Sequence, residues 1–343
     1  MSHSITEEPS DELWKAFLST FPGGNFEQSC EYGEITKNAF PNSKALRLGI
    51  THDGEMAGII QGTYSKYLGF GMTLLVERGP IINAERGEKA RIAKSLLEAM
   101  EDVGKKRRII QAQILLPETF QLQQVFQELG YSNKGEINEY FVNVRKSAEE
   151  LWRSISHNKR RNIKKAMKEG VEVIRSHDVD DLLTFYSMLE DTQRRRGFST
   201  YPLSWFEAAW TIREPEELAR VFLARLEGET ISGIFVVTHG KNVYALAAAS
   251  LEKGWRVRPN DLMHWKAMEW ACETGFSKYY MGRVKQPPPN QESRGWGVWR
   301  WKREWMGDLE KMIIMEKTFL GRYKLVLKAK GLAERCLAWF KKS

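Results

Sequence analysis

The sequence predicts a mixed α/β protein built from two copies of one unit, because two internal matches are separated by about half of its 343 residues. Residues 47–63 and 222–238 each show an alternating apolar strand, a Gly-Glu turn and a second apolar strand. Residues 88–104 and 261–275 each show an amphipathic helix that leads into a strand. A chain of this length exceeds what one hydrophobic core usually supports. Two unrelated α/β domains with similar hairpins are the alternative.

The hairpins share two glycines. Gly54 and Gly228 stand at the turns, where a β-hairpin requires positive φ. Gly58 and Gly233 follow in the second strand, where a glycine marks a bulge or a close approach of another backbone. Each half is therefore expected to contain a helix, an antiparallel hairpin or meander, a second helix and a further strand.

The domain boundary is expected after the strand at 139–144. We place the first domain at 1–147 and the second at 148–316. The segment 317–343 is expected to join the first domain. That segment is basic and amphipathic, and it either packs against the body of the protein or lies on an anionic membrane surface.

Composition limits the class of protein. The formal net charge of +8 favours an anionic partner such as a nucleic acid, a phosphorylated substrate or an anionic membrane face. The N-terminus does not resemble a signal peptide, and no stretch approaches the roughly 18 apolar residues of a membrane span. The three cysteines are scattered, which is typical of reduced thiols and not of a zinc site. We expect a soluble, cytoplasmic protein without a metal.

A basic helix is predicted at 157–169, beginning after a cap at Ser156 and ending before Gly170. Its cations either form a solvated face or contact the phosphates of a nucleic acid or nucleotide. The candidate phosphate-binding residues are Lys159, Arg160, Arg161, Lys164 and Lys165.

Two further segments combine charge with aromatic residues or a loop. Arg194, Arg195 and Arg196 precede Gly197, so they either complement the end of a helix dipole or hold a diphosphate. Residues 294–307 contain four tryptophans among basic residues, and these indoles form either core or an edge that faces lipid or a partner.

Common motifs for phosphate, metal and acyl-ester chemistry are missing from the sequence. It has no P-loop, no GxSxG, no HExxH and no GxGxxG after a strand. It also lacks the usual glycine-rich loop of acetyl-CoA-dependent enzymes, whose backbone N–H groups receive a pyrophosphate.

Several segments in order along nearly the whole chain resemble the Fem-type aminoacyltransferases, which build peptidoglycan bridges. The matching segments are 77–82 (ERGPII), 158–166 with Gly170-Val171, Thr192 with 196–198, Tyr244 with 249–250 and 259–263, and Trp301-Lys302 with Gly307.

The resemblance implies two tandem GNAT-like domains, in a compact form without the helical arm of some members. It implies transfer of an amino acid from aminoacyl-tRNA to an amino group of a lipid-linked or nucleotide-linked peptidoglycan precursor. The first domain would hold the acceptor and the second would carry the chemistry. No cofactor is implied beyond aminoacyl-tRNA as co-substrate, and the basic C-terminal segment would allow peripheral contact with the inner face of the membrane.

The resemblance also assigns residues. Lys302 would be the catalytic lysine, whose ammonium stabilises a developing oxyanion, and Trp301 would shape the pocket beside it. The basic helix would contact tRNA. The substrate-binding residues would be Lys37 and Arg196, which would contact precursor phosphates, together with Tyr244 and Arg78.

The sequence departs from the Fem pattern at two positions. Asn83 stands where family members often carry an acid, so no general base is assigned, and Ala248 replaces a glycine. Two alternatives to aminoacyl transfer stay open: an acyl-CoA-dependent N-acyltransferase on the same fold, and a non-catalytic relative that binds tRNA or membrane.

Overall fold

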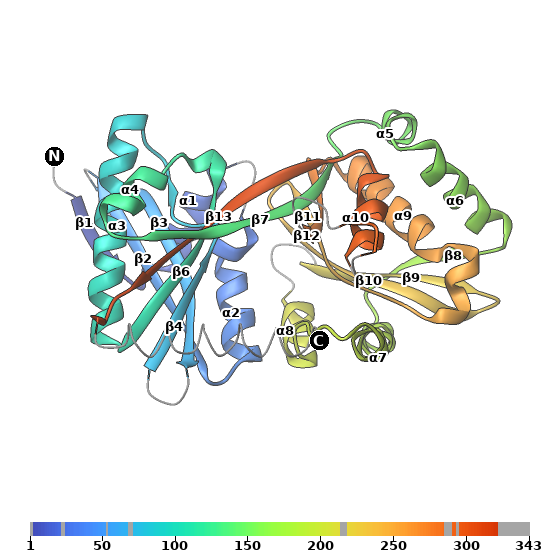
Figure 1. Cartoon of the computed structure of the whole chain (residues 1–343), viewed down its shortest axis with the longest axis horizontal. Coiled ribbons are helices and arrows are strands. Elements are labelled where there is room, and N and C mark those ends of the chain that lie inside the picture. Colours follow the sequence, from blue (N-terminus) through green and yellow to red (C-terminus); the bar gives the residue numbers. More distant parts are fainter. Residues whose placement is uncertain are drawn as a thin grey trace. The chain divides into compact units, whose positions relative to one another are not determined.

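The computed structural model describes residues 3–21, 25–52, 54–67, 71–212, 218–284, 290–292 and 295–321. The chain forms two compact units, whose elements are labelled in Figure 1. Of the described residues, unit 1 contains those up to Phe17, those within Phe40–Glu136 and those from Met312 onward. Unit 2 contains Leu18–Ala39 and Ile137–Lys311.

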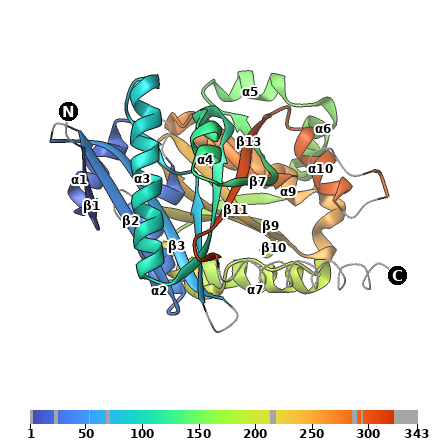
Figure 2. The ribbon, with the colours of Figure 1, turned by 60° about the vertical axis from the view of Figure 1, so that its left-hand side comes forward.

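Unit 1 is a mixed sheet with the strand order β1, β2, β3, β4, β6, β13. Strands β4 and β6 are parallel and are joined by α3 (Arg86–Lys106), which lies along the sheet in Figure 2. The core of unit 1 is largely aliphatic and is built from the strands, α3 and α4 (Gln123–Glu128). The strands are β1 His3–Glu7, β2 Ser43–His52, β3 Glu55–Tyr67, β4 Gly71–Glu77, β5 Ile81–Ile82 (paired with β3), β6 Ile109–Pro117 and β13 Asp308–Thr318.

Unit 2 has the strand order β8, β9, β10, β11, β12, β7. Here β11 and β12 are the parallel pair, joined by α9. Helices α5, α6, α9 and α10 lie over one face of this sheet, and α7 and α8 lie over the other (Figure 1). The strands are β7 Ser132–Asn143, β8 Glu172–Ser176, β9 Ala219–Leu226, β10 Glu229–His239, β11 Asn242–Ser250 and β12 Lys278–Val284.

The remaining helices connect these strands. They are α1 Asp11–Ser19, α2 Cys30–Ala39, α5 Ala148–Ser154, α6 His157–Lys168, α7 Val179–Arg196, α8 Leu203–Thr211, α9 Pro259–Thr274 and α10 Trp296–Arg303, with short 3-10 helices at Phe26–Gln28, Glu118–Phe120 and Glu252–Val257. Among the described helices, none is both long and apolar enough to span a lipid bilayer.

The two units share one topology. An antiparallel meander, a crossover helix and a parallel strand follow each other as β2-β3-β4-α3-β6 in unit 1 and as β9-β10-β11-α9-β12 in unit 2. Each meander is preceded by a strand and helices, namely β1, α1 and α2 or β8, α7 and α8. The predicted mixed α/β fold with two copies of one unit is therefore confirmed.

The hairpin glycines have the predicted roles. Gly54 and Gly228 have φ of 89° and 79° at the two turns. The strand register shifts just before Gly58 in one hairpin and just before Gly233 in the other. A β-carbon at either residue would lie about 3 Å from a side chain of α3 or of Phe185 on α7. Each glycine therefore lets a helix approach its sheet closely.

The compact units divide the chain differently from the predicted ranges of 1–147 and 148–316. Residues 18–39 belong to unit 2, where α2 packs on α8 and the Ser204 hydroxyl donates to the Ala39 carbonyl at 3.2 Å. The boundary after unit 1 falls within β7, between residues 136 and 137. Of the C-terminal segment predicted to join the first domain, residues 317 and 318 pair with β6, and residues 322–343 lie outside the described part.

Candidate active site

The parallel strands β11 and β12 separate soon after they begin. They pair only at Asn242–Tyr244 with Lys278–Tyr280. On its other side β12 pairs with β7, and the register of that pairing shifts between Tyr280 and Arg283. Gly282 lies in the shift with φ of 78°, a conformation that favours glycine. Backbone carbonyls of β12 are therefore left for partners other than a neighbouring strand.

Lys302 of α10 supplies that partner. Its ammonium donates to the Gly282 carbonyl at 3.1 Å and to the Arg283 carbonyl at 3.0 Å, and its side chain is buried. Burial lowers the pKa of Lys302 to about 8, and the negative charge of Glu139 on β7 opposes that shift. An ammonium has three N–H donors, so two fixed hydrogen bonds direct the third toward another acceptor.

The helix that carries Lys302 is anchored by a buried ion pair. Lys159 is fully buried, and its ammonium donates to Asp261 Oδ1 at 2.6 Å. The Trp301 indole N–H donates to the same oxygen, also at 2.6 Å. The Lys159 nitrogen lies 4.5 and 4.7 Å from the ring centroids of Trp301 and Trp305, and 3.6 Å from Glu304 Oε2. One ammonium therefore joins α6, α9 and α10.

His264 lies in the same buried network. Its Nδ1 is 3.0 Å from the Tyr279 hydroxyl, and its ring packs edge-on against Trp301 with centroids 4.9 Å apart. Burial, together with the charges of Lys159 and Lys302, lowers the pKa of His264 to about 3. The imidazole is therefore neutral at pH 7. Sequence patterns missed this residue, although it follows Asp261 by one helical turn on α9.

The predicted phosphate-binding helix forms, with the Ser156 hydroxyl capping α6 at the Lys159 amide. Its cations nevertheless divide into two groups. The assignment of Lys159 to phosphate binding is wrong, because its ammonium is buried in an ion pair with Asp261. Arg160 has a structural role, since its Nη1 donates to three backbone carbonyls at and after the end of α5. The exposed members of the set are Arg161, Lys164 and Lys165.

The other predicted substrate residues lie in different environments. Lys37 is exposed in the last turn of α2 in unit 2. Tyr244 is buried there, with its ring stacked on Tyr280 at 5.0 Å. Arg78 is buried in unit 1, where its backbone has φ of 55°. Arg196 is exposed at the end of α7 in unit 2. Of the predicted site residues, the structure brings Trp301, Lys302 and Lys159 together.

No set of three or more His, Cys, Asp or Glu side chains in the described part of the chain is arranged to hold a metal ion. The chemistry available where β11 and β12 separate is that of an ammonium that binds the backbone of β12 and has one hydrogen-bond donor to spare. Such a group can stabilise negative charge on a carbonyl oxygen.

Known proteins resemble the chain in sequence. Residues 153–303, which include Lys302, match the acetyltransferase (GNAT) domain family. The chain is 22% identical to the lipid II:glycine glycyltransferase of Staphylococcus aureus over 88% of each protein.

Solved structures give the same picture of the fold. A crystal structure of FemX superposes with a TM-score of 0.79 and 20% identity, covering 95% of this chain and all of that one. A tandem GNAT protein from the clavulanic acid biosynthesis pathway superposes with a TM-score of 0.60 and 10% identity, covering 93% and 99%. The second of these shows that the chain shares the fold of a tandem GNAT protein. The chain is therefore similar in sequence to a lipid II:glycine glycyltransferase over most of its length, and it has the fold of FemX and of a tandem GNAT protein.

Proposed function

We propose that this protein is an aminoacyltransferase, which moves an amino acid from aminoacyl-tRNA to an amino group of a peptidoglycan precursor. The observation that carries the proposal is the buried Lys302 ammonium, held by the Gly282 and Arg283 carbonyls at the opening between the parallel strands. A glycyltransferase that resembles the chain over 88% of its length supports the reaction class.

The reaction forms an amide and breaks an ester. The acceptor nitrogen attacks the carbonyl carbon of the aminoacyl ester, and the carbonyl oxygen gains negative charge in the tetrahedral intermediate. The free N–H of Lys302 donates to that oxygen, which stabilises the charge. When the intermediate collapses, the C–O bond to ribose breaks, the ribose oxygen takes up a proton, and the attacking nitrogen loses one.

The pKa of Lys302 also suits proton transfer. Because burial lowers it to about 8, the ammonium is still the main form at pH 7 but gives up a proton more readily than an exposed lysine. Lys302 can therefore donate to the departing ribose oxygen. In this proposal Trp301, whose indole N–H donates to Asp261, shapes the substrate pocket beside Lys302.

Further roles in this proposal follow the family pattern. Unit 2 carries the chemistry. Lys37, Tyr244 and Arg78 contribute to acceptor binding, and the exposed cations Arg161, Lys164 and Lys165 contact tRNA. Aminoacyl-tRNA is the co-substrate, with no further cofactor.

The test uses the purified full-length protein, a set of charged tRNAs, and peptidoglycan precursors as amine acceptors. We expect transfer by the wild type and a loss of about 100-fold or more in Lys302→Ala, the scale seen when an oxyanion donor is removed. Lys241→Ala, which changes an exposed lysine in the turn between β10 and β11 of the same unit, is the matched control for the folded state. Undiminished transfer by Lys302→Ala would refute the catalytic role. Consumption of acyl-CoA with no use of aminoacyl-tRNA would instead establish the acyl-CoA-dependent alternative.

A further inference from the structure

The end of α7 and the 3-10 helix after β11 form one exposed surface of unit 2, which we call the Arg–Trp corner. Phe198 and Trp255 are 45% and 41% exposed on it, although large aromatic side chains are usually buried. The corner is made of Arg196, Phe198, Trp255, Arg256 and Arg258, all of which are exposed.

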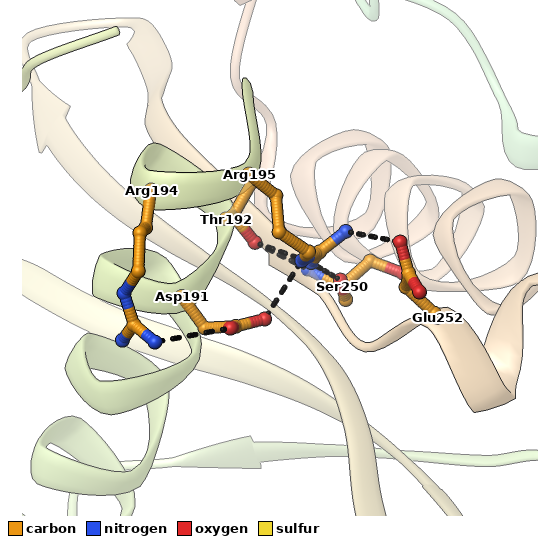
Figure 3. A network of polar contacts seen from close by, with 6 residues as sticks. All are labelled: Asp191, Thr192, Arg194, Arg195, Ser250 and Glu252. Carbon is orange, nitrogen blue, oxygen red and sulfur yellow. Dashed lines mark hydrogen bonds and ion pairs between the residues drawn. The ribbon is translucent and has the colours of Figure 1, made fainter. Parts of the chain in front are cut away.

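A bracing arginine holds the two segments together. Arg195 donates to the Ser250 carbonyl at 2.6 Å, to Asp191 at 2.8 Å and to Glu252 at 3.5 Å (Figure 3). Arg195 therefore ties the last turn of α7 to the end of β11, whereas Arg194 contacts only Asp191 in this view. These hydrogen bonds hold the end of α7 beside the 3-10 helix that carries Trp255.

In the Arg–Trp corner a guanidinium lies against an indole. Arg196 Cζ lies 5.2 Å from the centroid of the Trp255 ring, and Arg195 Cζ lies 5.5 Å from it. Both groups are flat and polarisable. Aromatic rings and guanidinium planes are the surfaces on which proteins stack unpaired nucleic-acid bases.

The charge at the corner is positive and largely uncompensated. Within the described part of the chain, Arg196, Arg256 and Arg258 have no acidic partner, whereas the neighbouring Arg195 and Lys253 are paired with carboxylates. Helix α9 begins at Pro259, so the positive end of its dipole adds to the same field. An anionic ligand is therefore favoured here.

The position of the corner relates it to the candidate active site. Trp255 follows the carboxyl end of β11, and the carbonyls that hold Lys302 lie on β12, which runs parallel to β11. The carboxyl ends of parallel strands meet at one edge of a sheet, where ligands of α/β folds bind. Small ligands are usually enclosed in concave pockets, whereas single strands of nucleic acid bind along open, cationic, aromatic surfaces.

We propose that the Arg–Trp corner binds the unpaired 3′ end of tRNA, with a base stacked on Trp255 and Arg196 and the adjoining phosphates held by Arg196, Arg256 and Arg258. The inference rests on the proposed function, because it assigns a site to the RNA part of the donor. It moves Arg196 from the precursor phosphates, where the sequence pattern placed it, to the phosphates of tRNA.

Binding of deacylated tRNA to the full-length protein, followed by fluorescence anisotropy, tests the proposal without requiring turnover. We expect Trp255→Ala to weaken binding about 10-fold, and Trp255→Phe to retain most of it. Arg196→Ala should lower the slope of log K against log salt by about one. Arg194→Ala is the matched control, because Arg194 is an exposed neighbour on α7 that lies outside the corner.

A second RNA locates the contact. Removing the single-stranded 3′ end from tRNA should weaken binding to the wild type but not to Trp255→Ala. Wild-type affinity in both Trp255→Ala and Arg196→Ala would overturn the inference, even if aminoacyl transfer is found. If the same two variants instead bind tRNA as the wild type does but lose binding to phosphatidylglycerol vesicles, that result would assign the corner to a lipid surface and would also overturn the inference. A wild type that transfers no amino acid from tRNA contradicts the proposed function separately.

Discussion

The crossovers of the two units differ in how far their parallel strands stay together. In unit 1, β4 pairs with β6 from Met72 to Glu77, along almost all of its length. In unit 2, the equivalent β11 pairs with β12 at only three residues, Asn242–Tyr244. The parallel strands therefore stay paired in unit 1 and separate in unit 2. Lys302 binds the backbone of unit 2, so the separation of the strands is what creates the candidate site.

The crossover helices differ in the same sense. Aligned on their shared Ala-Met-Glu, α3 and α9 place Asp261 and His264 at the positions of Ala93 and Leu96. All four side chains are buried. Unit 1 fills these positions with apolar core, whereas unit 2 fills them with a carboxylate and an imidazole that contact Lys159, Trp301 and Tyr279. At these two positions, polar groups replace core packing in the unit whose α10 carries the candidate catalytic lysine.

The largest effect is expected from breaking the buried pair of unit 2. Lys159→Met should lower the free energy of unfolding by about 3–5 kcal/mol, because it leaves the Asp261 carboxylate buried without its cation. Urea denaturation followed by circular dichroism measures this. The double variant Lys159→Met with Asp261→Ala imitates unit 1 and should recover most of the loss, since an apolar replacement of a buried ion pair is often neutral. A single variant as stable as the wild type would contradict the importance of the pair.

An intermediate effect is expected from acid. His264 is neutral in the folded protein with a pKa of about 3, whereas its ordinary value is 6.5. Between these values the unfolded chain binds more protons than the folded one, so stability falls as pH decreases from about 6.5 toward 3. The slope from this one group is at most about 1.4 kcal/mol per pH unit.

Thermal denaturation at a series of pH values measures this dependence. His264→Asn removes the titrating group and leaves an amide that can still accept from the Tyr279 hydroxyl. The melting temperature of this variant should depend less steeply on pH between 6.5 and 4 than that of the wild type. Identical pH profiles would show that the folded protein keeps His264 in its ordinary range.

Much of this comparison could be predicted from sequence, because hairpin glycines and helical periodicity are local signals. The burial of Lys159 could also have been predicted from the sequence. It stands four residues before Ile163 and seven before Ala166, so it occupies the inward face of α6 with those two buried residues. The many cations of this helix suggested an exposed basic face and not an inward position for Lys159. The hydrogen bonds from Lys302 to Gly282 and Arg283 could not be predicted, because they depend on where two strands separate and on a shift of register far along the chain.

The smallest effect is expected from breaking a partly exposed ion pair in unit 1. Lys317 of β13 forms an ion pair with Glu101 of α3, and both side chains keep some exposure, at 20% and 16%. Water screens such a pair, and its partner can be solvated when it is left alone, so Lys317→Met should change the free energy of unfolding by about 1 kcal/mol or less. The same urea titration as for Lys159→Met gives the comparison directly. Equal losses in the two variants would mean that burial does not distinguish the two ion pairs. A loss of unfolding free energy that is several-fold smaller in Lys317→Met than in Lys159→Met would show that the ion pair in the unit with Lys302 contributes more to stability.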